Sequence, residues 1–166
     1  MVHIRVAEAS DVDAICDFGA VNIPLYYVPL IGLQAAKTHL AAWWNEAHIS
    51  ESVHNQEVFV ATVNDKVIGV GQYHLRGDEY IIWKLYVHPD YQGNGIGVQL
   101  IDAIIEFLNG ATSKILIVHF AANERAGKFY ERERFYLKSI EPNSAGDHRA
   151  DTVWREREIS PYQLKR

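Results

Sequence analysis

The stretch that most constrains this chain is residues 87–97, which read Val-His-Pro-Asp-Tyr-Gln-Gly-Asn-Gly-Ile-Gly. A β-rich run over residues 80–87 leads into it, and an apolar helical pattern over about residues 98–108 leads out. We therefore expect a strand, a stop at Pro89 and a helix opened by glycines. The first N–H groups of a helix lack intrahelical partners and lie at its positive end, and glycine lets a phosphate approach the backbone. The stretch predicts a bound phosphate or pyrophosphate, and hence a cofactor. The alternative is an ordinary strand-to-helix turn, which rarely needs three glycines.

Two common phosphate-binding loops do not fit the glycine spacing. The dinucleotide fingerprint is Gly-x-Gly-x-x-Gly near the first strand, and the nucleoside triphosphate loop requires Gly-Lys-Ser/Thr. Here Gly93, Gly95 and Gly97 lie past the middle of the chain, without that Gly-Lys-Ser/Thr. Instead, residues 92–97 fit a Gln/Arg-x-x-Gly-x-Gly/Ala pattern, preceded by Leu-x-Val-x-Pro at residues 85–89. This pattern resembles the acyl-CoA-binding motif of the GNAT superfamily of N-acetyltransferases.

A second match lies downstream, at residues 123–130. These residues read Asn-Glu-Arg-Ala-Gly-Lys-Phe-Tyr, which resembles the Asn-x-x-Ala-x-x-Phe-Tyr segment of the same superfamily. The two motifs occur in the family's order, with a predicted strand over residues 114–120 between them. The resemblance covers nearly the whole chain, and its specific part is residues 80–135.

Hydrophobic patterning predicts the order β-α-α-β-β-β-α-β-α-β-β, an α+β, three-layer α/β/α fold in a single domain over residues 1–166. Residues 22–29, which contain two prolines, predict a loop, and residues 32–52 predict helical material. The resemblance implies a mixed, mostly antiparallel sheet of about seven strands, splayed between the fourth and the fifth. Relatives often have Gly-Phe where this chain has Arg134-Phe135, so we expect a different helix ending or backbone strain there.

Composition narrows the class of protein. The chain has 166 residues, 48% of them hydrophobic and 22% charged, as in one soluble globular domain. A net charge of −5 argues against a nucleic-acid partner, and the hydrophobic runs predict no membrane partner. A single cysteine excludes an internal disulfide and, with no signal-peptide pattern at the start, predicts a cytoplasmic location. The eight histidines lack zinc-site spacing, so we expect no metal.

The resemblance implies a reaction and a co-substrate. The reaction is transfer of an acetyl group from acetyl-CoA to a primary amine of a small molecule or peptide, by direct attack in a ternary complex. The loop holds the pyrophosphate, the strand before it lies along the pantetheine with the Leu85 amide as oxyanion donor, and Asn123 binds the pantetheine arm. The cofactor-binding residues implied in this way are Leu85, Tyr86, Val87, Gln92, Gly93, Asn94, Gly95, Ile96, Gly97, Asn123 and Lys128.

Two residues are the catalytic candidates. By the resemblance, Tyr130 is the general acid that protonates the leaving thiolate; the alternative is an aromatic core residue beside Phe129. In many relatives a glutamate on the fourth strand acts as the general base, at positions that are Ile81 and Trp83 here. Glu79 is the nearest alternative base, acting through a water chain, or else a solvated turn residue. Lys84, unusual within this strand, either binds an anion or extends to the sheet edge.

The acceptor side is expected to involve residues 23–52 and 141–151, as in relatives. Tyr26, Tyr27, Trp43 and Trp44 offer an aromatic wall for an amine, although adjacent helix positions diverge by about 100° and at most one tryptophan should face a pocket. Competing hypotheses are a catalytically weak acyl-CoA sensor with the same fold and a nucleotide-binding enzyme. Many relatives form homodimers, but nothing in the sequence locates an interface.

Overall fold

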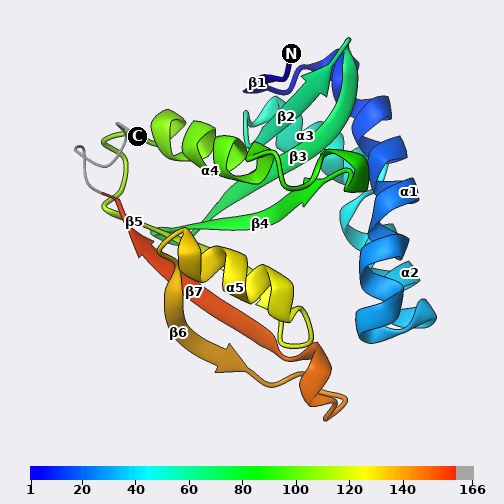
Figure 1. The fold of residues 1–166 in the computed structure, drawn as a ribbon, viewed down its shortest axis with the longest axis vertical. Coiled ribbons are helices and arrows are strands. Elements are labelled where there is room, and N and C mark those ends of the chain that lie inside the picture. Colours follow the sequence, from blue (N-terminus) through cyan, green and yellow to red (C-terminus); the bar gives the residue numbers. More distant parts are fainter. Residues whose placement is uncertain (160–166) are drawn as a thin grey trace. The chain divides into compact units, whose positions relative to one another are not determined.

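The computed structural model describes residues 1–159, and its elements follow the predicted order with one difference: three α-helices, not two, lie between β1 and β2 (Figure 1). The chain divides into two compact units. The first unit comprises residues 1–72 and 84–104, and the second comprises residues 73–83 and the part of the chain from residue 105 onward. Strands β3 (Lys66–Arg76) and β4 (Glu79–Val87) pass from one unit into the other. That residues 1–166 act as one domain stays a prediction.

The sheet has seven strands in the order β1-β2-β3-β4-β5-β7-β6. The pairs β1–β2, β2–β3, β5–β7 and β6–β7 are antiparallel, whereas β4 and β5 are parallel. Among the described residues, the parallel register joins Ile81 to Leu116 and Ile82 to Ile117 and ends there. The predicted fold class, a mixed and mostly antiparallel sheet with a separation of the fourth and fifth strands, is confirmed.

The first unit surrounds its strands with four helices. Its elements are β1 (His3–Val6), the short 3-10 helix η1 (Ala9–Asp11), α1 (Val12–Ile31), α2 (Leu33–Trp43), α3 (Glu46–His54), β2 (Val58–Val63), most of β3, the end of β4, the 3-10 helix η2 (Pro89–Tyr91) and most of α4 (Ile96–Phe107). Helices α1 and α2 run side by side (Figure 1).

Strand β3 shows how the two faces of the sheet are used in the first unit. A Cβ at Gly69 or Gly71 would lie 3.4 Å or less from side chains of α4, and Gln72 donates to Ser52 Oγ of α3 at 3.0 Å. Successive strand residues point to opposite faces, so α4 covers one face of β3 and α3 covers the other. The two glycines let α4 pack close to the strand.

Helix α1 differs from the sequence prediction. The predicted loop over residues 22–29 is wrong, because α1 continues through Pro24 and Pro29 to Ile31. Each internal proline costs about 3 kcal/mol of helix propensity. Ile23 and Tyr27 are buried against neighbouring elements, and the buried Asn22 side chain donates to Phe18 O at 2.9 Å. This tertiary packing outweighs the cost of the two prolines.

The helical material predicted over residues 32–52 is two helices. The helix is interrupted between Trp43 and Glu46, where the Asn45 side chain caps α3 by accepting from His48 N at 2.8 Å. The two tryptophans diverge as expected, since Trp44 is buried and Trp43 is half exposed.

One helical stretch in the described chain, residues 9–31, is long and apolar enough to cross a membrane, with a mean hydropathy of 1.4 over its best window. Core helices of soluble proteins pass the same test, which is weak evidence for a span. In the structure this stretch packs on α2 and α3. The absence of a membrane partner stays a prediction.

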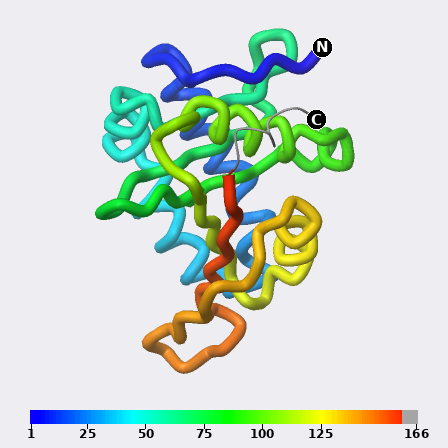
Figure 2. The backbone as a smooth tube through the Cα atoms, turned by 90° about the vertical axis from the view of Figure 1, so that its left-hand side faces the viewer, coloured from blue at the N-terminus to red at the C-terminus, as the bar shows by residue number. Residues whose placement is uncertain are grey.

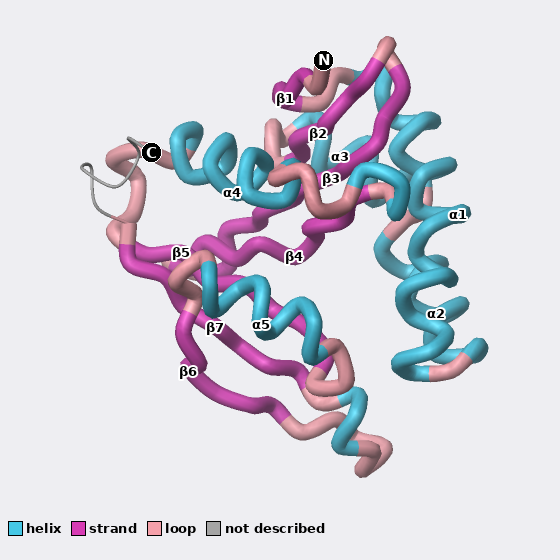
Figure 3. The backbone as a smooth tube through the Cα atoms, viewed as in Figure 1, coloured by secondary structure: helices cyan, strands magenta, loops and turns pink. Residues whose placement is uncertain are grey.

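Among its described residues, the second unit carries β5 (Lys114–Phe120), α5 (Glu124–Arg132), β6 (Tyr136–Glu141), the 3-10 helix η3 (His148–Ala150) and β7 (Thr152–Glu158) (Figure 3). Strand β7 lies between β5 and β6. A Cβ at Gly127 of α5 would meet His119 of β5 at 3.2 Å and Arg155 of β7 at 3.3 Å, so α5 packs closely on these strands. The loop of residues 142–151, orange in Figure 2, is anchored by Asp151, which accepts from Asn143 N at 3.0 Å.

Candidate active site

The glycine-rich loop ends at the start of α4. Gly93 and Gly95 have φ angles of 80° and 76°, the left-handed region that favours glycine. No described atom lies within 4 Å of a Cβ built on either residue. The first helical bond of α4 runs from Gln99 N to Gly95 O at 3.0 Å, which makes Gly95 the N-cap residue. The backbone around this exposed glycine N-cap is therefore uncovered by side chains, and its binding of a phosphate stays a prediction.

The side chain of Gln92 holds this loop to the rest of the first unit. Its Nε2 donates to the Tyr26 hydroxyl at 2.8 Å and to Val87 O at 3.1 Å, and the Tyr26 hydroxyl also donates to Val87 O. Within the loop, Asn94 Nδ2 donates to Tyr91 O at 3.1 Å. The Gln92 and Asn94 side chains thus shape the loop. Sequence reasoning assigned both residues to the cofactor and missed Tyr26 as the clamp of the loop; both cofactor assignments stay predictions.

The end of β4 carries an aromatic group on the side of α1 and α2. The hydroxyls of Tyr86 and Tyr27 share a hydrogen bond, and the Tyr86 ring lies 5.6 Å from the ring of Trp44. Burial raises the pKa of Tyr27 to about 12, so this phenol stays protonated. Leu85 and Val87, the other cofactor candidates on β4, are partly buried.

Lys84 is the unexpected member of this strand. Its side chain is 4% exposed, which excludes the prediction that it extends to the sheet edge. Its Nζ donates to Gln72 Oε1 at 2.8 Å, and Gln72 in turn donates to Ser52. Burial lowers the pKa of Lys84 to about 7. The sequence signal for this polar cluster was the pair of polar residues inside otherwise apolar strands.

Helix α5 in the second unit holds three more candidates. Asn123 is its N-cap, with Oδ1 accepting from Ala126 N at 3.2 Å. Tyr130 is 6% exposed, and the ring centroids of His119, Phe129 and Phe135 lie 5.5 to 6.1 Å from its own. Lys128 is exposed. These positions neither confirm nor exclude the assigned roles, which stay predictions.

His119, next to Tyr130, is held as a neutral imidazole. Its Nε2 accepts from Arg155 Nε at 2.9 Å, and its Nδ1 lies 2.8 Å from Phe120 O, which fits a proton on Nδ1. Burial, with a smaller effect of the Arg155 charge, lowers the pKa of His119. The histidine is therefore a fixed, uncharged neighbour of the Tyr130 ring.

Glu79, the candidate base, opens β4 in the second unit. Its carboxylate lies 3.1 Å from Lys138 Nζ, which also lies 3.3 Å from Glu156. The Glu79 side chain is about one-third exposed. The carboxylate is thus engaged in a surface ion-pair network, and its role as a base stays a prediction.

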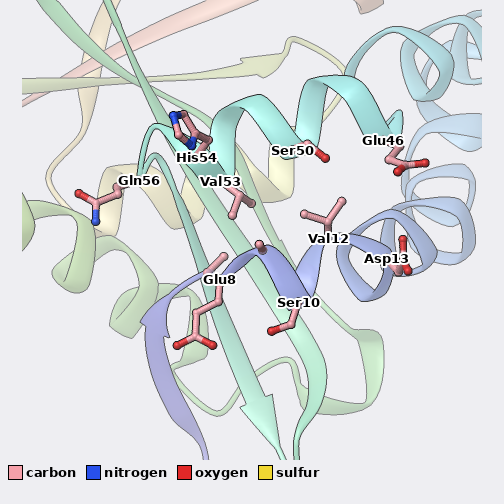
Figure 4. Close-up of a pocket in the computed structure, with 11 residues that line it drawn as sticks. Glu8, Ser10, Val12, Asp13, Glu46, Ser50, Val53, His54 and Gln56 are labelled. Atoms are coloured by element: carbon pink, nitrogen blue, oxygen red, sulfur yellow. The ribbon is translucent and has the colours of Figure 1, made fainter.

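The described residues also contain an open pocket of about 560 Å³ between the start of α1 and the end of α3 (Figure 4). Glu8, Asp13, Glu46 and His54 contribute polar groups to its lining. It contains none of the predicted site residues. Within residues 1–159 no group of three or more histidine, cysteine or carboxylate side chains is placed to hold a metal ion.

The parallel β4–β5 pair within a mostly antiparallel sheet, and the glycine-opened α4, define the class of the protein as an acyltransferase with an N-acetyltransferase fold. The chain belongs to the acetyltransferase (GNAT) family, whose domain model matches residues 54–136. Acetyl transfer is the reaction of this family. No curated protein matches the chain.

Solved structures confirm the fold over almost the whole chain. PaiA N-acetyltransferase from Thermoplasma acidophilum, solved in complex with coenzyme A, has a TM-score of 0.80 at 13% identity, with 96% of this chain and 99% of that chain covered. The ribosomal-protein-S18-alanine N-acetyltransferase from Escherichia coli has a TM-score of 0.68 at 24% identity, with 96% and 95% covered. The IAA acetyltransferase from Bacillus cereus has a TM-score of 0.66 at 19% identity, with 96% and 100% covered.

Proposed function

We propose that this protein transfers an acetyl group from acetyl-CoA to a primary amine of a small molecule or peptide, by direct attack in a ternary complex. The observation that carries the proposal is the open start of α4, where Gly93 and Gly95 expose backbone in left-handed conformations. The N–H groups of Ile96, Gly97 and Val98 are the first of the helix and have no intrahelical acceptors. Such donors, at the positive end of the helix dipole, suit a pyrophosphate.

In the first unit, the proposed cofactor contacts are this loop and the end of β4; in the second unit, they are Asn123 and Lys128 of the α5 segment. Backbone groups of Leu85, Tyr86 and Val87 bind the pantetheine, and Asn123 retains its amide Nδ2 for the same arm. Lys128, exposed on α5, offers a positive charge to a phosphate. A similarly folded N-acetyltransferase is known in complex with coenzyme A, which supports this choice of co-substrate.

The chemistry requires an oxyanion donor and an acid. The Leu85 amide is the proposed donor, and one preorganised donor typically lowers the barrier by about 3 to 4 kcal/mol. The Tyr130 hydroxyl is the proposed acid for the thiolate that leaves when the C–S bond breaks. A phenol pKa near 10 and a thiol pKa near 8.5 are close enough for a short proton transfer.

For the acceptor, the partly buried rings of Tyr26 on α1 and Tyr86 on β4 support an amine. Their centroids lie 6.1 Å apart, and Tyr86 also packs against the buried rings of Tyr27 and Trp44. Aromatic faces attract ammonium groups. One similarly folded enzyme acts on the alanine of a ribosomal protein, so peptides with a free N-terminus belong in any acceptor panel. We expect a cytoplasmic protein without a nucleic-acid, membrane or metal partner.

The test combines ligand stabilisation with turnover. Acetyl-CoA should raise the melting temperature, whereas ATP and NAD should not. Release of free thiol should then be followed with 1,4-diaminobutane, phenethylamine and a hexapeptide that starts with alanine. Stabilisation without turnover on any amine would favour an acyl-CoA sensor, and stabilisation by ATP or NAD alone would favour a nucleotide-binding enzyme.

A matched pair of variants tests the loop itself. Gly95→Asp places a carboxylate where the pyrophosphate is proposed to bind, and we expect coenzyme A affinity to fall at least about 100-fold in calorimetry, or about 2.7 kcal/mol. Gly77→Asp is the control, because Gly77 also has a left-handed φ of 65° and open space around a Cβ. Unchanged affinity in Gly95→Asp would remove the loop from the cofactor site.

A further inference from the structure

The proposed reaction needs a base, and the residues at the relatives' glutamate positions cannot supply one. An amine that arrives as an ammonium must lose a proton before its nitrogen can attack. Neither Ile81 nor Trp83 carries a side-chain group that accepts a proton near neutral pH. Ile81 is fully buried, and the Trp83 ring packs 5.5 Å from that of Trp154. Glu79 lies six residues before Leu85 in the sequence, and Glu79 is paired with Lys138.

The same strand carries one buried titratable side chain directly before Leu85. We propose that Lys84 is the catalytic base that takes a proton from the attacking amine, and that His48 passes this proton on to solvent. This inference rests on the proposed acetyl transfer. Lys84 Nζ donates to the side-chain carbonyl of Gln72 at 2.8 Å. The Lys84 side chain lies on the same face of β4 as Tyr86, which belongs to the aromatic group proposed to bind the amine.

The surroundings of Nζ permit both the neutral and the charged form. No ion pair joins Lys84 to a carboxylate of residues 1–159, and Glu57 only raises its pKa through space. An ammonium has three donors, which three acceptors would satisfy, so the shortage of acceptors favours the neutral amine. After proton transfer, the Trp44 ring, 5.2 Å from Nζ, stabilises the new positive charge. The balance is a pKa of about 7.

The other charged and titratable groups around Lys84 are Glu57, which precedes β2, His48 on α3, His39 on α2 and Tyr86 on β4, whose hydroxyl shares a hydrogen bond with Tyr27 on α1. Burial, and then the Lys84 charge, lower the pKa of His39 to about 4, while Tyr27 stays protonated, so neither competes for the proton near pH 7.

A route to solvent leads through His48. Its Nε2 lies 3.5 Å from Lys84 Nζ, its side chain is only partly buried, and its ring packs against the half-exposed Trp43. An imidazole accepts and releases protons near neutral pH, which suits a relay.

The proton balance is complete. The substrate ammonium gives one proton to neutral Lys84, and its nitrogen lone pair forms the C–N bond at the thioester carbonyl. When the C–S bond breaks, the electron pair leaves with sulfur, and sulfur gains one proton from Tyr130. The nitrogen of the new amide gives its second proton to the Tyr130 phenolate, which restores the phenol. Lys84 then releases the first proton through His48, so each turnover releases one proton.

The experiment compares Lys84→Met, Lys84→Arg and the exposed-strand control Lys66→Met, with acetyl-CoA and the fastest amine among 1,4-diaminobutane, phenethylamine and the alanine peptide. Both Lys84 variants should lower kcat/KM about 100-fold or more, because neither side chain accepts a proton, while coenzyme A affinity stays within about threefold. The wild type should lose kcat/KM below about pH 7, and the Lys84 variants should lack that limb. Lys66→Met should match the wild type.

Lys84→Met should fold. The pKa of Lys84 is lower in the folded chain than its ordinary 10.5, so the unfolded chain binds more protons between about pH 7 and 10.5. The folded state therefore bears the full cost of this burial below about pH 7 and is relieved of it as the pH rises, and Lys84→Met removes the cost.

Each possible result either supports or contradicts a catalytic role for Lys84. Recovery of activity and of the wild-type pH profile in Lys84→Arg would reduce Lys84 to a structural charge and overturn the inference, as would unchanged kinetics in Lys84→Met. Should both variants aggregate, His48→Gln supplies the answer. If His48 relays the proton, His48→Gln should lower turnover about tenfold, and added imidazole buffer should restore it. Unchanged turnover in His48→Gln would contradict the relay. A wild type that binds acetyl-CoA but acetylates none of the amines removes the proposed function, and with it this inference, before any variant is compared.

Discussion

Helices α4 and α5 differ in how their first N–H groups are capped. Helix α4 begins after Gly95, which has no side chain to cap it and leaves the first N–H groups open. Helix α5 is closed at both ends: the Asn123 side chain caps its start, and at its finish Arg134 N donates to Glu131 O and Phe135 N donates to Tyr130 O. The second pattern is a Schellman motif, with Arg134 in the left-handed position at a φ of 67°.

This difference shows why the loop needs glycine. Left-handed residues in this chain need not be glycine, because Arg134 and both residues of the Asn64–Asp65 hairpin adopt that conformation. Dihedral angle alone therefore does not explain Gly93 and Gly95. What distinguishes them is access, since a side chain there would cover open backbone donors. The start of α4 thus leaves its first N–H groups without a side-chain cap, whereas the start of α5 uses one of them in a bond to Asn123.

The largest expected effect concerns the hydroxyl that α5 carries. Tyr130→Phe keeps the backbone carbonyl that closes the helix and removes only the proposed acid. We expect turnover to fall about 10- to 1,000-fold with a near-normal melting temperature. Tyr136→Phe, on an exposed tyrosine of β6, is the control. Equal activity of Tyr130→Phe and the control would return Tyr130 to the role of a core aromatic.

A smaller substitution separates access from strain at α4. Gly95→Ala adds one methyl group to a left-handed residue, which costs roughly 1 kcal/mol of stability. If the methyl also blocks a phosphate, coenzyme A affinity falls about tenfold, or ~1.4 kcal/mol, measured by calorimetry. A loss of stability alone, with normal affinity, would make the loop an ordinary turn.

The sequence predicted most of the order of strands and helices along the chain, the helix opened by glycines, and a different ending or strain at Arg134. Each has a local signature: hydrophobic periodicity, glycine spacing, and an arginine where relatives often have glycine. It missed the continuation of α1 through Pro24 and Pro29, since only burial against neighbouring helices compensates for two prolines. It also left Lys84 undecided, because its partners Gln72 and Ser52 are brought to it by tertiary pairing.

The capping of α5 offers a test with a matched site. Asn123→Ala and Asn45→Ala each remove one N-cap bond, which should cost about 1 kcal/mol in denaturant unfolding, and Asn45→Ala also removes the exposed bonds from Nδ2 to Ala41 O and Ala42 O. Only Asn123→Ala should also raise the KM for acetyl-CoA, because only Asn123 is proposed to contact the pantetheine. Parallel effects on KM in both variants would leave Asn123 with a structural role alone.

The smallest expected effect is a gain. Arg134 is exposed and holds a left-handed φ that costs an ordinary residue about 1 to 2 kcal/mol, whereas glycine adopts it freely. Because glycine also loses more conformational entropy on folding, we expect Arg134→Gly to raise the free energy of unfolding by only about 0.5 to 1 kcal/mol. Arg134→Ala controls for the lost charge and should leave stability nearly unchanged, since alanine keeps the strain. Equal stability of the two variants in urea unfolding would mean that the Schellman bonds and the Tyr130–Phe135 ring contact, with centroids 6.1 Å apart, already absorb the strain, and that α5 is closed as firmly with arginine as with glycine.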